Sequence, residues 1–201
     1  MKAIVYIHGK GGSAAESAHY EPLFPGWDVL GIDYRTFTPW ETGPELHAAI
    51  QALKNGYDRI DLIANSIGAY FSMHAQLAGL IERAFFISPI VDMEALIGNL
   101  MRAAQVSEAE LEAKGVIPTA FGEDLSWAYL DYVRRHPVTW TVPTHILYGA
   151  HDALTAPETI RAFAARHSAS LTVMEDGEHW FHTVQQLRFL DDWIRRYAAE
   201  D

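Results

Sequence analysis

The sequence has no cysteine, and basic residues are scarce beside acidic ones. Without cysteine, the chain has no disulfides, thiolate nucleophiles or Cys-ligated metals. Lys and Arg number 15 against 26 Asp and Glu, which gives a formal net charge of −11. A surface of this sign repels the phosphates of nucleic acids and anionic lipids. We therefore expect neither a nucleic acid nor a membrane as a partner.

Long apolar runs are also missing. The sequence starts MKAIVYIHGKGG, with one lysine and five apolar residues before His8. That run is too short for the core of a signal peptide and far too short to span a membrane. We interpret it as a buried strand and expect a cytoplasmic enzyme.

What the sequence does contain is a regular series of short apolar segments. Its 201 residues, 49% hydrophobic and 20% charged, suit one packed domain. Six runs rich in Ile, Val, Leu and Phe are mostly unbroken, which is typical of strands buried on both faces of a parallel sheet. Helical patterns lie between most of them, so we predict a three-layer α/β fold with right-handed crossovers. The six runs are Ala3–His8, Val29–Tyr34, Ile60–Asn65, Ala84–Ile90, Thr144–Gly149 and Ser170–Glu175.

One stretch departs from this alternation. About 50 residues, from Val91 to Val142, separate the fourth run from the fifth, far more than one crossover helix needs. We predict a single domain over residues 1–201, with a helical insertion over about 91–142 that lies over one end of the sheet. A helical extension that only packs its aromatic residues against the core is the alternative. The expected helices are Met93–Ala104, Ser107–Lys114 and Glu123–His136.

The residues after each strand matter most for function, because ligands of open parallel sheets bind beyond the carboxyl ends of the strands. The third run is followed by Ala64-Asn65-Ser66-Ile67-Gly68. A serine in such a strand-to-helix turn needs small residues two positions before and after it, and Ala64 and Gly68 meet this need. Ser66 is therefore a candidate nucleophile. The alternative is a serine that caps a helix.

An aspartate and a histidine follow the last two runs. Asp152 comes after the fifth run, and His179 follows a glycine turn after the sixth and precedes a helix expected over Trp180–Ala199. Each alone is as well explained by an ordinary loop residue. Together with Ser66 they occur in the order Ser, acid, His, each at a strand's carboxyl end, which is the order of one type of catalytic triad.

On these motifs the sequence resembles the α/β-hydrolase family, from His8-Gly9 to His179-Trp180-Phe181. The resemblance implies a helical cap between the fourth and fifth strands, and it assigns Ser66 as nucleophile, His179 as base and Asp152 as the acid. The family's sheet has eight strands and opens with an antiparallel hairpin. Because this sequence starts at what would be the third strand, we expect six strands, in the order 2-1-3-4-5-6.

The glycine-rich segment after the first strand, His8-Gly-Lys-Gly-Gly-Ser13, resembles the family's oxyanion loop. By this likeness, the backbone N–H groups of Lys10 and Ile67 form the oxyanion hole. Such a loop also occurs in phosphate-binding sites. However, the Gly-Lys-Ser/Thr signature is absent and no acidic ribose ligand is evident, which argues against nucleotide binding.

Two residues compete for roles in the triad. Asp92 follows the fourth run, and some members of the family place the acid there. His182 lies one helical turn beyond His179 and is an alternative base. A His-x-x-His metal site is a further alternative, but His-Glu-x-x-His is absent and no third ligand stands out. We therefore predict neither a metal nor an organic cofactor.

The expected activity is that of a serine hydrolase that cleaves a small ester, a carboxylesterase. A serine nucleophile argues against the epoxide-hydrolase and dehalogenase branches of the family, which use aspartate. Thioesterase, lipase-like, acyltransferase and peptidase activities use the same triad, and a ligand-binding protein without turnover is the alternative from another class. The expected partner is a small-molecule ester.

Overall fold

The computed structural model describes residues 1–199. The chain divides into two compact units, which we describe separately: residues 1–91 together with the residues from Trp140 onward, and residues 92–139. Within residues 1–199, no helix combines the length and the apolar character that a membrane span needs.

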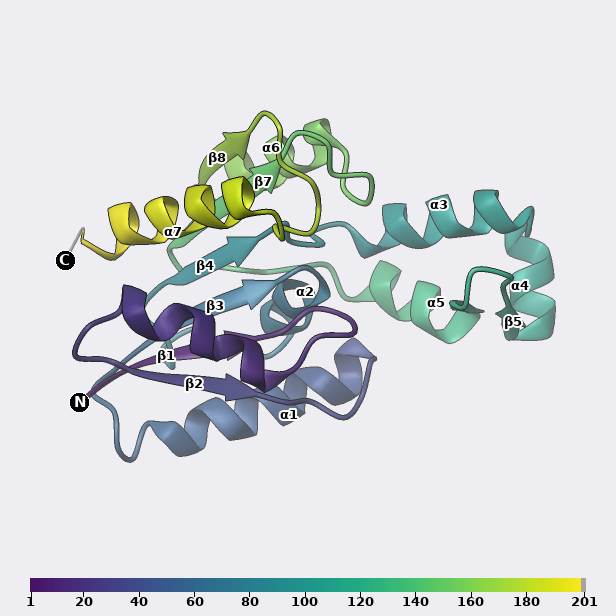
Figure 1. The fold of residues 1–201 in the computed structure, drawn as a ribbon. Coiled ribbons are helices and arrows are strands. Elements are labelled where there is room, and N and C mark those ends of the chain that lie inside the picture. The colour runs from purple at the N-terminus through teal and green to yellow at the C-terminus, as the bar shows by residue number, and fades with distance from the viewer. Residues whose placement is uncertain (200–201) are drawn as a thin grey trace. The chain divides into compact units, whose positions relative to one another are not determined.

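The first unit is built around a six-stranded sheet (Figure 1). Its order is β2-β1-β3-β4-β7-β8, and every neighbouring pair is parallel. These are the six strands expected from the sequence, in the predicted order. They are β1 (Lys2–Ile7), β2 (Asp28–Ile32), β3 (Arg59–Asn65), β4 (Ala84–Ile87), β7 (Thr144–Gly149) and β8 (Ser170–Met174).

The central strands are buried on both faces, which explains their unbroken apolar sequences. In β1, for example, Ile4 and Tyr6 belong to a core cluster with residues of η1 (Ala14–Leu23) and α7 (Val184–Ala198). The alternate side chains, Val5 and Ile7, are also buried. Successive side chains of a strand point to opposite faces, so both faces of the sheet need a covering layer.

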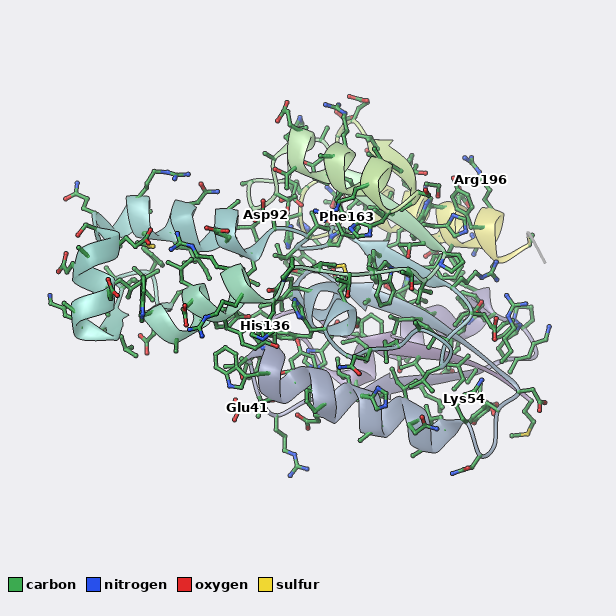
Figure 2. All side chains as sticks on the ribbon, turned by 180° about the vertical axis from the view of Figure 1, so that it is seen from behind. Glu41, Lys54, Asp92, His136, Phe163 and Arg196 are labelled. Carbon is green, nitrogen blue, oxygen red and sulfur yellow. The ribbon has the colours of Figure 1, made fainter. Side chains whose placement is uncertain are left out.

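Helices provide both layers. On the face opposite to η1 and α7 lie α1 (Pro39–Leu53), α2 (Ile67–Met73) and α6 (Pro157–Arg166). Figure 2, seen from behind, shows α1 in front of the strands between the labelled Glu41 and Lys54, and α6 at Phe163. The prediction of a three-layer α/β fold is confirmed.

The last helix begins later than expected. The sequence pattern predicted a helix from Trp180, but α7 starts at Val184. The Thr183 hydroxyl accepts from the N–H of Gln186, and the Gln186 side chain accepts in turn from the backbone of Thr183. This capping box satisfies the free N–H groups of the first turn. Residues 179–182 therefore remain in a loop.

The second unit is not wholly helical. It contains α3 (Met93–Ala104), α4 (Glu108–Lys114) and α5 (Trp127–Arg135), close to the three expected helices. Between α4 and α5, however, β5 (Val116–Pro118) and β6 (Asp124–Ser126) pair as a short antiparallel ladder. The third helix therefore starts at Trp127 and not at Glu123, because residues 124–126 are paired with β5. That this unit lies over one end of the sheet stays a prediction.

A buried ion network holds the amino-terminal end of the sheet. The carboxylate of Asp61 on β3 is fully buried and accepts from Arg59 Nε at 3.1 Å and from Arg83 Nε at 2.7 Å. Arg83 also donates from Nη1 to the carbonyl of Tyr197 in α7, at 2.8 Å. The network thus links β3 and the residue that precedes β4 to α7.

We expect Asp61→Ala to lower the free energy of unfolding by about 3–5 kcal/mol, because it leaves buried guanidinium charge without its partner. Urea unfolding followed by circular dichroism measures this. The matched control is Asp192→Ala, which removes an exposed partner of Arg195 on α7 and should change stability little. Equal effects of the two substitutions would contradict the assigned role of Asp61.

Candidate active site

Ser66 stands at a strained turn between β3 and α2. Its φ is 53° and its ψ is −121°, a region that non-glycine residues rarely adopt. The backbone is held on both sides, because Ser66 N–H donates to the carbonyl of Ile87 at 3.0 Å and its carbonyl accepts from Ile90 N–H at 3.1 Å. A Cβ at Gly68 would lie 2.4 Å from the carbonyl oxygen of His8, so only glycine fits there. The small residue that the sequence motif demands is thus explained by a close approach to β1.

The loops after β7 and β8 are held together by a second close approach. A Cβ at Gly149 would lie 2.5 Å from backbone atoms of Gly177. Two backbone hydrogen bonds join these loops: Ala150 N–H donates to Met174 O at 2.9 Å, and His151 N–H donates to Gly177 O at 2.8 Å. The loop that carries Asp152 and the loop that carries His179 are therefore packed against each other.

The structure brings the three predicted residues together. The Ser66 hydroxyl and His179 Nε2 are 2.8 Å apart, and His179 Nδ1 lies 2.7 Å from Asp152 Oδ2. The Asp152 side chain is fully buried, whereas that of His179 is 21% exposed. A serine that faces one nitrogen of an imidazole, with a buried carboxylate at the other, is the arrangement of a Ser-His-Asp triad.

Asp152 is fixed by its own loop. Its Oδ1 accepts from the N–H groups of Leu154, at 2.7 Å, and Thr155, at 3.1 Å, which leaves Oδ2 for His179. The Thr155 hydroxyl donates to the carbonyl of Pro89 at 3.3 Å, and Tyr148 donates from its hydroxyl to the carbonyl of Thr155 at 2.7 Å. These bonds orient the carboxylate without any contribution from the histidine.

The two competing residues make other hydrogen bonds. Asp92 caps α3 in the second unit, where its Oδ1 accepts from Ala95 N–H at 2.9 Å. His182 is turned toward its own loop, with Nδ1 2.7 Å from the carbonyl of Trp180. His179 is the histidine that contacts both Ser66 and Asp152.

Comparison with known proteins rests on solved structures. An esterase from Butyrivibrio proteoclasticus, Est1E with ferulic acid bound, matches with a TM-score of 0.77 at 17% identity, over 100% of this chain and 89% of that one. Mouse alpha/beta hydrolase domain-containing protein 10 matches with a TM-score of 0.75 at 16% identity, over 98% and 89%. A Pyrococcus furiosus esterase matches with a TM-score of 0.68 at 20% identity, over 98% and 80%. The chain has the α/β-hydrolase fold.

Sequence comparison adds nothing to this assignment. No protein-family model matches the sequence, and no curated protein matches it. At 16–20% identity, structural likeness establishes the α/β-hydrolase fold and leaves function to be argued from the site.

The loop after β1 of this α/β-hydrolase fold lies against Ser66. A Cβ at Gly9 would be 3.2 Å from the Cβ of Ser66. His8 is buried, its ring stacks on Tyr34 at 4.3 Å, and its carbonyl accepts from the Tyr34 hydroxyl at 2.9 Å. Lys10 follows Gly9 directly, and Ile67 is the first residue of α2, whose N–H has no partner within the helix. Both predicted oxyanion residues thus belong to segments that adjoin Ser66.

A pocket is lined by sequence neighbours of Ser66 and His179. It has a volume of about 230 Å³, and its lining includes Asn65, which precedes Ser66, and Trp180 and Phe181, which follow His179. Tyr6 and Glu16 also line it. The neighbours of Ser66 and His179 could have been found from the sequence. Glu16 could not, because only the packing of η1 on the sheet brings it there.

A metal site is not evident in the part of the chain that the structure describes. Within residues 1–199, no three His, Asp or Glu side chains are grouped so that they could hold a metal ion.

The contact between Gly149 and Gly177 gives a prediction. We expect Gly149→Ala to lower kcat/KM by about 100-fold, because the added Cβ forces the two loops apart and displaces Asp152 from His179. The matched control is Gly56→Ala, where the nearest atom to the new Cβ is 3.9 Å away. Steady-state ester hydrolysis measures both variants. Full activity of Gly149→Ala would show that the loops do not depend on this contact.

Proposed function

We propose that this protein is a serine hydrolase that cleaves small esters through an acyl-enzyme on Ser66. The observation that carries the proposal is the continuous pair of contacts from Ser66 through His179 to Asp152, at 2.8 and 2.7 Å. The strained backbone of Ser66 adds support, because such strain gathers at functional sites.

In the first step His179 Nε2 takes the hydroxyl proton of Ser66 while the serine oxygen attacks the ester carbonyl. Asp152 holds the Nδ1 proton and stabilises the imidazolium that forms. His179 then gives its proton to the leaving alcohol as the carbon–oxygen bond of the ester breaks. The acyl group remains on Ser66, and one alcohol is released.

The tetrahedral intermediate carries a negative oxygen that needs donors. We assign this role to the backbone N–H groups of Ile67 and Lys10, since both segments adjoin Ser66. A donor of this kind typically contributes about 3–4 kcal/mol to transition-state stabilisation.

In the second step water replaces the alcohol. His179 takes a proton from the water as it attacks the acyl-enzyme, and then returns a proton to Ser66 as the carboxylic acid leaves. The net reaction consumes one ester and one water and yields one acid and one alcohol. The esterases among the similar structures support an ester as substrate.

The test is covalent labelling by a fluorophosphonate probe, which reacts with activated serines. We expect stoichiometric labelling of the wild-type protein at Ser66, located by peptide mass spectrometry, and none in Ser66→Ala. Hydrolysis of a panel of aryl esters of graded acyl length should be lost in the same variant.

A matched control comes from the same chain. Ser168 is exposed and has a φ of 52°, close to the 53° of Ser66, but it lies in the turn between α6 and β8, before the amino end of β8, whereas His179 follows the carboxyl end of that strand. Ser168→Ala should keep full labelling and turnover. Absence of labelling in well-folded wild-type protein would refute the proposed function.

A further inference from the structure

The pocket lined by Asn65, Trp180 and Phe181, the sequence neighbours of Ser66 and His179, has walls of two kinds. Ile87, Phe181 and Leu190 contribute an apolar wall, and these three residues are buried. Asn65 and Glu16 contribute polar groups. Its volume of about 230 Å³ lies below the range of about 300–1,000 Å³ usual for drug-sized ligands, so it suits a small group of a substrate.

The charge of the pocket is negative. The described residues that line the pocket include the carboxylate of Glu16. They include neither lysine nor arginine. The lining also includes His19, whose Nε2 lies 2.8 Å from Asp191 Oδ1, so this pair carries no net positive charge. The whole chain, at −11, adds to the same field.

A hydrogen bond from Tyr6 holds the carboxylate of Glu16 in place. The Tyr6 hydroxyl donates to Glu16 Oε2 at 2.5 Å. Burial, then the neighbouring Tyr20 and the bond to Glu16, raise the pKa of Tyr6 above its usual range, so the phenol remains a donor. A Cβ on Gly12 would lie 2.7 Å from the other oxygen, Oε1, so this glycine gives the carboxylate room beside the loop.

Aromatic rings surround the same space. Tyr6, Tyr20, Trp180 and Phe181 all line it. Ring faces attract cations, and a carboxylate next to them accepts hydrogen bonds from a primary ammonium group. The pocket therefore combines both features that recognise a small organic cation.

The lining residues that follow His179 suggest which half of the ester the pocket binds. In the proposed mechanism His179 protonates the leaving alcohol, so the alcohol oxygen must lie near His179 Nε2. Trp180 and Phe181, directly after His179, form part of the lining. The pocket therefore adjoins the segment that carries His179, which assigns it to the alcohol half of the ester.

Building on the proposed function, we infer that this pocket binds a primary ammonium group on the alcohol half of the substrate, with Glu16 as its counter-charge. The preferred substrates are then small esters of amino alcohols. Glu16 is a residue that determines specificity, and it takes no part in the chemistry at Ser66.

The experiment compares two esters of the same size. In 4-aminobutyl acetate the alcohol chain ends in an ammonium group, and in pentyl acetate it ends in a methyl group. We expect wild-type kcat/KM to be at least about tenfold higher for the charged ester. Glu16→Gln, which keeps an acceptor for Tyr6 and removes the charge, should abolish this preference by lowering kcat/KM for 4-aminobutyl acetate far more than for pentyl acetate.

The matched control is Glu21→Gln, an exposed residue of the same helix, η1, that is not among the described lining residues. It removes the same charge and should keep the preference for 4-aminobutyl acetate. An equal loss in both variants would mean that only the overall charge matters, and this would overturn the inference. So would equal rates of the wild-type protein on the two esters, or an equal loss on both esters in Glu16→Gln.

Binding without turnover separates this inference from the proposed function. In Ser66→Ala, NMR titration should show that 4-aminobutyl acetate binds more tightly than pentyl acetate, with a shift of the indole N–H of Trp180, and that Glu16→Gln removes the difference. If the wild-type protein takes no fluorophosphonate label but this binding difference is present, the proposed function fails and the cation pocket stands. If labelling occurs and the two esters bind equally, the pocket inference alone fails.

Discussion

Replacing His179 with alanine is expected to lower kcat for ester hydrolysis by about 10⁶-fold, the scale seen when a base of this kind is removed from a serine hydrolase. Without the imidazole, no group accepts the proton of Ser66, whose hydroxyl lies 2.8 Å from His179 Nε2. Residual turnover comes from substrate binding and the oxyanion hole alone. Stopped assays at high protein concentration, with the fluorophosphonate label as a second readout, measure the loss.

The control for this prediction is His182→Ala. His182 is an exposed histidine of the same loop, and its Nδ1 faces the carbonyl of Trp180. Its removal should change kcat by no more than about twofold, as surface substitutions usually do. A large loss in His182→Ala together with little loss in His179→Ala would reverse the assignment of the base.

The second large effect is expected for Asp152→Asn, a loss of about 10⁴-fold in kcat. The amide oxygen can still accept from Leu154 and Thr155, so the loop keeps its shape. The amide nitrogen then faces His179 Nδ1 and donates a hydrogen bond to it, which favours the tautomer that cannot take the proton of Ser66. Thermal unfolding should therefore change far less than activity.

Asp92→Asn tests the competing acid. Asp92 caps α3, and asparagine caps helices about as well as aspartate. We expect wild-type stability and wild-type kcat/KM in steady-state ester hydrolysis. If Asp92→Asn abolished turnover and Asp152→Asn did not, the acid would be Asp92, and the contact between Asp152 and His179 would have no catalytic role.

Much of the fold was predictable because burial leaves a direct trace in the sequence. Strands such as Ala84–Ile87 have no exposed face, so their apolar runs are unbroken and mark the sheet. The two strands of the second unit left no such trace. In β5, for example, Val116 and Pro118 are exposed, and three residues are too few for a periodic pattern.

The candidate triad was predictable for a different reason. Parallel strands end at one edge of a sheet, so residues that directly follow three such strands must gather there. This rule selects Ser66, Asp152 and His179 from residues that are far apart in the sequence. It does not distinguish Asp152 from Asp92, since both follow a strand.

By itself, then, the sequence determined the positions of the six strands, the strand-to-helix turn at Ser66 and the set of side chains available at one edge, because these depend on local pattern and chain order. The order of the strands was expected from the resemblance to the α/β-hydrolase family. Only the tertiary structure decided which acid meets His179 and that Glu16 lines a pocket together with sequence neighbours of Ser66 and His179. Those contacts depend on how loops and η1 pack, as at Gly149 against Gly177, and packing between distant segments has no signature in the local sequence.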